Sequence, residues 1–412
     1  MTESSETAPT TMHDLTIPAW KTPKAILLGL VPPLLLVGVM AAIFATDGGL
    51  GDRNAPPIET LSVQQVRLPE PGMLEVEIVN DGPDDITIAQ VRVDDAYWEF
   101  SMSPQGSLER LGSATIRIPY PWVQDESHAI TMLSSTGVVF DAEVPVAIES
   151  PHTGRDEIVR YGLVGLYVGV VPVVLGLLWF PFMQRLGRKG MNFILALTVG
   201  LLVFLVVDMW GEAQEVALAA PSALKSDVLI PVLAVLSAGL LIVVGHTLQR
   251  RNERKSEDAS GLSLAYQMAS GIGLHNLGEG LAIGSAFAIG EAALGVFLIA
   301  GFTLHNVTEG VGIAAPLVRQ RPGLGHFAAL AAIAGGPAII GTWIGAFTYS
   351  PFWTTVFLAI GIGAIVQVVW SVGRIVWRSQ QRHSEPALTW ITLGGLAAGF
   401  AVMYFTALMV SA

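Results

Sequence analysis

Long apolar runs recur along this chain and limit its fold more than any other feature. Several exceed the roughly 20 residues that a helix needs to span a bilayer. Only 14% of the 412 residues are charged, whereas soluble globular proteins carry about 25%. The sequence therefore predicts a polytopic α-helical membrane protein, with eight spans after residue 158 at about 159–182, 190–211, 227–249, 260–288, 292–318, 326–348, 353–377 and 388–410.

Two features of the composition exclude whole classes of protein. The chain has no cysteine, which excludes a disulfide-built domain, cysteine-ligated zinc and iron–sulfur clusters. Its formal net charge of −12 argues against nucleic acid as a partner. The partners that we expect are a lipid bilayer, a small cation and a second copy of the chain in a homodimer.

The part of the chain before residue 159 differs from the rest. Residues 1–23 are polar and predict a disordered cytoplasmic tail. Residues 24–46 form an apolar run longer than a signal-peptide core, which predicts an anchor transmembrane helix, with a cleaved signal as the alternative. Residues 47–158 alternate in hydrophobicity, as in Met73–Val79 and Ile86–Val93. About seven such strands predict an external all-β, sandwich-like domain.

Basic residues gather on every second loop between the predicted spans. One set of loops holds Lys21, Lys24, Arg185, Arg188, Lys189, Arg250, Arg251, Arg254, Lys255, Arg319, Arg321, Arg374, Arg378 and Arg382. The opposite short loops hold almost only Lys225. Because Lys and Arg mark cytoplasmic loops, we expect a plasma-membrane protein with a cytoplasmic N-terminus and an external β domain and C-terminus.

Two of the predicted spans carry the same pattern, H-N-x-x-E-G, at His275–Gly280 and at His305–Gly310. His and Glu at i and i+4 lie on one helical face, and Asn at i+1 points about 100° away. Pairing the two helices would gather six polar side chains around one point. These are His275, Asn276, Glu279, His305, Asn306 and Glu309.

The cost of burying charge indicates what these six groups do. A charged side chain at the bilayer centre costs about 2.5–3.5 kcal/mol, and a divalent cation would compensate two glutamates. His with carboxylate suits zinc, iron, manganese or cobalt better than calcium or magnesium. Gly280 and Gly284 would let the helices approach closely. A purely structural network and a metal-free proton relay are the alternatives.

At these motifs the sequence resembles the ZIP family of divalent metal transporters, whose fourth and fifth helices carry H-N-x-P-E-G patterns. Both copies match except at the proline, which is replaced by Gly278 and Thr308. The resemblance covers residues 159–412 and leaves residues 1–158 as an addition. It implies an eight-helix domain with inverted repeats that imports zinc, iron(II) or manganese as substrate. Alternating access would move one bundle against the other, as in an elevator.

The resemblance also implies a ligand set. The primary metal site would be formed by His275, Glu279, His305 and Glu309. Asn276 and Asn306 would help to hold a second ion, bridged by the two glutamates. Many family members add a carboxylate from a later helix, but the matching stretch here, Gly363–Gly373, places Ser371 there, with Gln367 as the remaining polar group.

Other polar residues are candidates for a role along the path. Asp208, Glu212 and Glu215 share a face at the external end of their helix, as an entrance for cations or an ordinary solvated helix end. His246 lies near a cytoplasmic helix end, as an exit ligand or an interfacial histidine.

Two further functions compete with transport. A membrane-embedded metal hydrolase needs a general base beside an open metal position, and the chain has no HExxH motif. A metal-sensing receptor would use the β domain as its sensor, but no predicted cytoplasmic loop is large enough for an output domain. We therefore expect a transporter with no enzymatic activity and no resident cofactor.

Overall fold

The computed structural model describes residues 23–46, 57–252, 258–290, 292–318, 320, 322–386 and 388–411. The chain divides into two units, residues 1–57 and residues 58–412. The described part of the first unit is helix α1 (Pro23–Ala45), which contains Pro32 and Pro33. Most of the predicted N-terminal tail lies outside the described residues.

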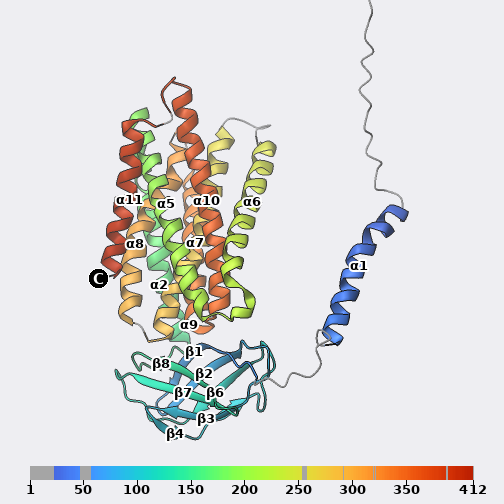
Figure 1. Ribbon diagram of the computed structural model, residues 1–412. Helices are drawn as coiled ribbons and strands as arrows, with labels where there is room; N and C mark the ends of the chain where they lie inside the picture. The colour runs from blue at the N-terminus through green and yellow to red at the C-terminus, as the bar shows by residue number, and fades with distance from the viewer. Residues whose placement is uncertain are drawn as a thin grey trace, which may run out of the picture. The chain divides into compact units, whose positions relative to one another are not determined.

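The second unit begins with two four-stranded antiparallel sheets, ordered β1-β2-β6-β5 and β4-β3-β7-β8 (Figure 1). The strands are β1 (Leu61–Glu70), β2 (Met73–Asn80), β3 (Ile88–Val93), β4 (Ala96–Trp98), β5 (Ser101–Ser103), β6 (Ser113–Ile118), β7 (His128–Ser134) and β8 (Val139–Val144). Every second side chain of β2 is buried, as the alternation predicts. Ile78 and Ile116 of one sheet and Val93 and Ile130 of the other belong to one apolar core, which confirms an antiparallel β region.

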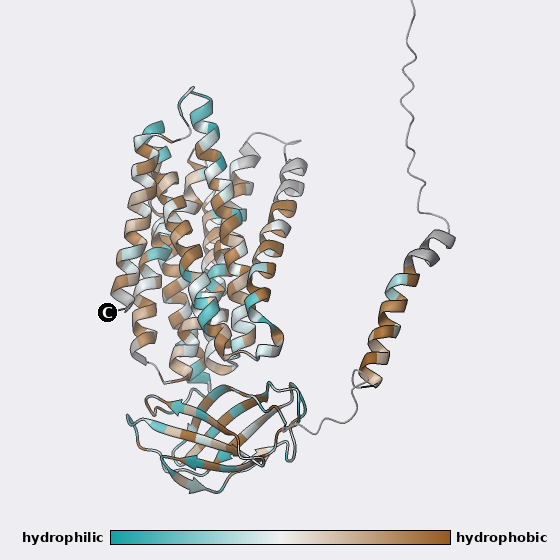
Figure 2. Cartoon of the chain, in the orientation of Figure 1, coloured by the Kyte–Doolittle hydropathy of each residue, from teal (hydrophilic) through white to brown (hydrophobic). Residues whose placement is uncertain are grey.

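The rest of the unit is helical. Its elements are α2 (Arg155–Gly165), the π-helix η2 (Leu166–Val170), α3 (Val171–Leu177), α4 (Phe180–Met183), α5 (Arg188–Ala219), the short 3₁₀ helix η3 (Ser222–Leu224), α6 (Ser226–Asn252), α7 (Asp258–Ala288), α8 (Ala292–Ala314), η4 (Ala315–Leu317), α9 (Leu324–Phe347), α10 (Pro351–Gln381) and α11 (Trp390–Ser411). Within the described residues, seven helical segments are long and apolar enough to cross a membrane. Figure 2 shows that hydrophobic residues predominate along these helices. The seven apolar helices suggest a multi-pass membrane protein, as predicted.

Two of the nine predicted spans are missing from those seven. The described apolar part of α1 is a shorter stretch, Leu30–Ala45. Helix α7 has 31 residues, but its motif residues and many glycines lower its hydropathy. It packs against α6, α8, α9 and α10, and Met268 and Ile272 are fully buried. A helix that is surrounded by other helices does not contact lipid and does not need an apolar surface. The hydropathy of the central helix α7 is therefore too low for it to count as a membrane span.

The helices of this single unit can be grouped by their packing into two sets, called bodies here, which also pack against each other through α7 and α10 and through α8 and α11. The site body comprises α2, η2, α3, α7, α8 and α9. Glycines bring its backbones into contact: a Cβ at Gly280 would lie 2.2 Å from the Ala338 carbonyl oxygen, and one at Gly310 would lie 2.3 Å from that of Val173. Real Cβ atoms do not approach so closely, so these positions require glycine. The pairs α7–α9 and α3–α8 are therefore held backbone to backbone.

The flanking body comprises α5, α6, α10 and α11. It uses the same device, because a Cβ at Gly399 would lie 2.1 Å from the Leu197 carbonyl oxygen. One at Gly363 would lie equally close, 2.1 Å, to that of Ala234. Each body therefore has an interior that tolerates little relative movement of its helices.

The interface between the two bodies is packed differently. A Cβ at Gly271 of α7 would first meet the Val368 side chain of α10, at 2.8 Å. One at Gly312 of α8 would first meet the Thr198 side chain of α5, at 2.7 Å. Side chains can change rotamer where backbones cannot, so this interface is the more adaptable one.

The β region contacts both bodies at their helix ends. Ser62 donates a hydrogen bond to the Ala219 carbonyl at the end of α5, at 2.9 Å. The Ser222 amide donates to the Asp81 carboxylate at 2.7 Å. Ser150 approaches the Ala288 carbonyl at the end of α7, at 3.5 Å. The C-terminal ends of α5 and α7 therefore lie on the same side of the bundle, as the predicted alternation requires.

Candidate metal centre

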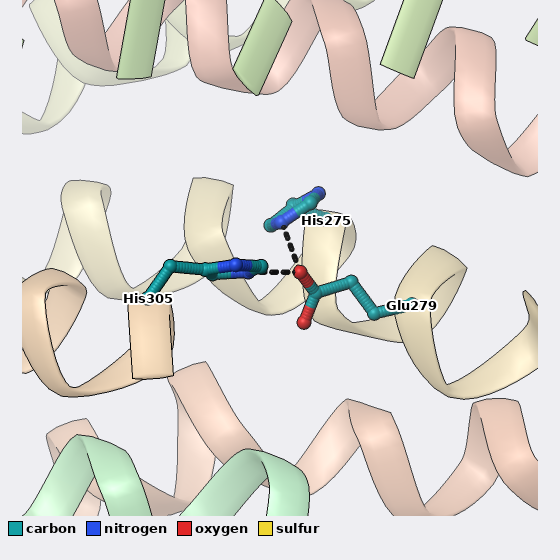
Figure 3. Close-up of side chains that lie close together, drawn as sticks. All are labelled: His275, Glu279 and His305. Atoms are coloured by element: carbon teal, nitrogen blue, oxygen red, sulfur yellow. Dashed lines mark hydrogen bonds and ion pairs between the residues drawn. The ribbon is translucent and has the colours of Figure 1, made fainter. Parts of the chain in front are cut away.

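The two motif copies meet between α7 and α8. All six of their polar residues are buried, with at most 4% of each residue exposed. Because His and Glu of one copy are one turn apart, each helix presents both toward the other. Figure 3 shows the rings of His275 and His305 converging on the Glu279 carboxylate.

Glu279 is the centre of this group. Its Oε1 atom pairs with Nε2 of His305 and lies 2.8 Å from Nε2 of His275. The contact with His275 is close enough for an ion pair, but its angle is not that of a hydrogen bond. One ligand atom from each of these three residues lies within 4.8 Å of the others. Glu309 is further away, with its Oε1 atom 3.9 Å from Nε2 of His275.

The centre has more unpaired acceptor atoms than unpaired donors, although both ring nitrogens of His275 also lack a hydrogen-bond partner among the described groups. Both Glu309 carboxylate oxygens are buried and accept no hydrogen bond from a described group, and the same holds for the Asn276 and Asn306 amide oxygens. An unsatisfied buried polar group costs about 1–3 kcal/mol, and more when it is charged. Lone pairs without donors are what a cation satisfies, so this imbalance points to a positively charged ligand.

The N–H groups of the two asparagine amides donate mainly to groups outside the unpaired acceptors of the centre. Asn276 donates to the Ala334 carbonyl of α9 at 3.0 Å. Asn306 donates to the Val168 carbonyl of η2 and to Oε2 of Glu279, both at 3.0 Å. Both amide N–H groups are therefore used in these hydrogen bonds, and both amide oxygens stay unpaired.

The sequence analysis did not identify the role of η2. Pro172 follows it and has no N–H to donate to the Val168 carbonyl in α-helical register. That carbonyl instead accepts the Asn306 amide. Single π-helical turns often occur at functional sites, and the proline inside an apolar run was the signal that could have revealed this one.

The predicted entrance residues lie on α5. Asp208 and Glu212 are close enough to His275 and Glu279 to interact electrostatically, and Glu215 is within the same range of Glu212. Asp208 and Glu215 are exposed and Glu212 is half-buried. The three carboxylates therefore follow α5 from the centre toward the end of that helix that contacts the β region.

The predicted accessory residues are not brought to the same place. Gln367 and Ser371 hydrogen-bond to each other at 2.9 Å on α10 and line a cavity between α6, α7 and α10. None of the six motif residues is among the described residues that line it. The side chain of His246 lies outside the described part of the chain.

Comparison with known proteins identifies no family. No protein-family model matches the sequence, and no curated protein matches it. The function must therefore be argued from the helices and the buried His–Glu–His group, which are compatible with a metal-binding membrane protein.

Proposed function

We propose that this protein transports a divalent transition-metal ion across the membrane, as a ZIP-like transporter. The observation that supports this most directly is the donor-poor group of imidazoles, carboxylates and amide oxygens buried between α7 and α8. Two imidazoles and a carboxylate suit zinc, iron(II) or manganese as the substrate. Asn276, Asn306 and Glu309 are the groups that would hold a second ion.

The two-body packing supports a mechanism of alternating access. The primary ligands all belong to the site body, in which α7 is held backbone to backbone against α9 and α8 against α3. The contact with the flanking body is made largely by side chains. Sliding the site body against the flanking body would carry the centre from one side of the membrane to the other without breaking it, as inverted-repeat transporters do.

The charges at the two ends of the bundle support import into the cytoplasm. Carboxylates on α5 lead from the β-region side toward the centre and would attract cations. Arg188 begins α5 at its other end, and Arg378 lies in the last turn of α10. By the positive-inside rule the arginine end is cytoplasmic, so the β region would face outward at the plasma membrane.

Transport can be tested directly in proteoliposomes. Uptake of zinc, iron(II), manganese and cobalt would be measured for the wild type beside Glu279→Ala and His305→Ala. The controls are Glu157→Ala and His326→Ala, because Glu157 pairs with Arg160 in the first turns of α2 and the exposed His326 contacts Tyr266, so neither belongs to the centre. We expect flux to be lost in both site variants and kept in both controls. A wild type that binds metal stoichiometrically but never moves it would refute transport.

Acidity should oppose loading of the centre. Imidazole binds a metal only when neutral, so proton binding competes with the metal. We expect metal affinity to fall as the pH is lowered, because protons then compete with the metal for the imidazoles and carboxylates.

A further inference from the structure

A second polar site lies between α6, α7 and α10. It is a cavity with about 210 Å³ of water-accessible space. The polar side chains that line it are Gln267, Gln367, Ser371, Arg374 and Arg378. Gly245 of α6 makes room for one of them, because a Cβ there would lie 2.9 Å from the amide oxygen of Gln267.

The charge in this cavity is positive, and no described residue pairs with it. Arg374 and Arg378 are one turn apart on α10, so they share a face. Neither forms an ion pair with a described carboxylate, whereas Arg188 at the same end of the bundle binds Glu385 through two hydrogen bonds of 2.7 and 2.6 Å. The Arg374 guanidinium lies 6.0 Å from the centre of the Trp370 ring, which orients it.

The neutral groups of the cavity also offer hydrogen-bond donors. The amide nitrogen of Gln267 is buried and has no hydrogen-bond partner. The amide of Gln367 donates to the Ser371 oxygen, which leaves the hydroxyl hydrogen of Ser371 available to donate in turn. Two guanidinium groups, an amide and a hydroxyl can therefore donate hydrogen bonds into this space, and the two guanidinium groups make it positively charged.

We propose that this cavity binds a phosphate-type oxyanion, supplied either by the headgroup of an anionic lipid or by a free phosphate. Arginine binds phosphate through two parallel N–H donors, and the amide and hydroxyl would take further phosphate oxygens. Trp370 and Trp377 flank the arginines and are 58% and 55% exposed, as expected for aromatic residues at a membrane interface. Basic pockets between helices on the cytoplasmic side suit lipid headgroups.

The position of the cavity gives the ligand a role. Gln267 belongs to the site body, and both arginines belong to the flanking body. A bound phosphate group would therefore connect the two bodies at their adaptable interface. The same two fixed positive charges make the cavity unsuitable as a passage for a divalent cation, so this proposal does not depend on the proposed transport function.

The test uses the full chain in detergent and native mass spectrometry. The probes are phosphatidylglycerol, inorganic phosphate and, as a neutral-headgroup control, phosphatidylcholine. The variants are Arg374→Gln combined with Arg378→Gln, and Arg374→Lys, which keeps the charge but loses the paired donors. Arg382→Gln is the matched control, because Arg382 is exposed and does not line the cavity. Thermal melting and metal binding check that every variant is folded.

We expect the double variant to lose affinity for the anionic probe by more than about tenfold, since hydrogen bonds to charged groups are the strong ones. Arg374→Lys should lose less, and Arg382→Gln should bind like the wild type. If the double variant loses affinity for phosphatidylglycerol alone, the phosphate group comes from a lipid headgroup. If it also loses affinity for inorganic phosphate, the cavity binds free phosphate. Equal retention of both anions by wild type and double variant would overturn the proposal.

Discussion

Glu279 and Glu309 occupy the same position in the two motif copies, but they have different surroundings. Glu279 contacts both imidazoles and accepts the Asn306 amide. Glu309 accepts no hydrogen bond from a described group, and its nearest imidazole contact is 3.9 Å. The repeated pattern makes both carboxylates face inward, whereas the neighbouring helices decide which of them is paired.

This asymmetry predicts unequal losses of metal affinity. Glu279→Gln should weaken zinc binding by more than about 100-fold, because it removes the carboxylate shared by both imidazoles. Glu309→Gln should weaken it about tenfold, as expected of a group at the edge of the centre. Competition with a fluorescent zinc chelator measures both values. Equal losses would mean that the cation lies midway between the two carboxylates.

The glycines that end the two motifs predict a matched loss of stability. Gly280→Ala and Gly310→Ala should each lower the free energy of unfolding by about 1–3 kcal/mol, the cost of overpacking. Gly278→Ala is the control, because its Cβ would first meet the flexible Leu358 side chain at 3.1 Å.

Thermal unfolding in detergent compares the three glycine variants. A Gly278→Ala protein as unstable as Gly280→Ala would contradict the backbone-contact argument.

In the metal-free protein, replacing each glutamate by glutamine should change the melting temperature in opposite directions. Glu309→Gln should raise the melting temperature, because it replaces an unsatisfied buried carboxylate, whose cost is about 1–3 kcal/mol. Glu279→Gln should lower it, because it breaks the pairing with two imidazoles. Thermal melts with a chelator present measure both, and a stabilising Glu279→Gln would reverse our assignment of the paired carboxylate.

The asparagines predict the smallest difference. Asn306→Ala removes a donor that orients Glu279 and should weaken zinc binding about tenfold. Asn276→Ala removes a donor to the Ala334 carbonyl and should weaken binding of the primary ion by less than about threefold. Isothermal titration reports affinity and stoichiometry together. A drop from two ions to one in both variants would show that their oxygens hold a second ion.

Much of the architecture could be predicted because it depends on local patterns. Period-two alternation in Met73–Val79 indicated a strand, and the apolar runs indicated helices, since each reflects which faces must be buried. The motif spacing placed His275 and Glu279 on one face for the same reason. The contribution of the Val168 carbonyl could not be predicted, because it depends on η2 lying beside α8.

The accessory residues show the limit of sequence position as a guide. Gln367 and Ser371 were expected near the second ion, but they line the arginine cavity instead. Residues one helical turn apart are separated by about 5.4 Å along the helix axis. Aligning a sequence motif with a family pattern one turn too far along the chain therefore assigns a side chain to the wrong site.

The sequence by itself determined that polar groups would be buried in membrane helices, and which groups these are, because hydropathy and helical period are local properties. The tertiary structure alone decided which acceptor atoms of the metal centre stay unpaired and which donors gather in the arginine cavity. Hydrogen-bond partners come from helices far apart in the chain, as Asn306 and Val168 do. Whether a buried group is satisfied therefore depends on packing that no local pattern contains.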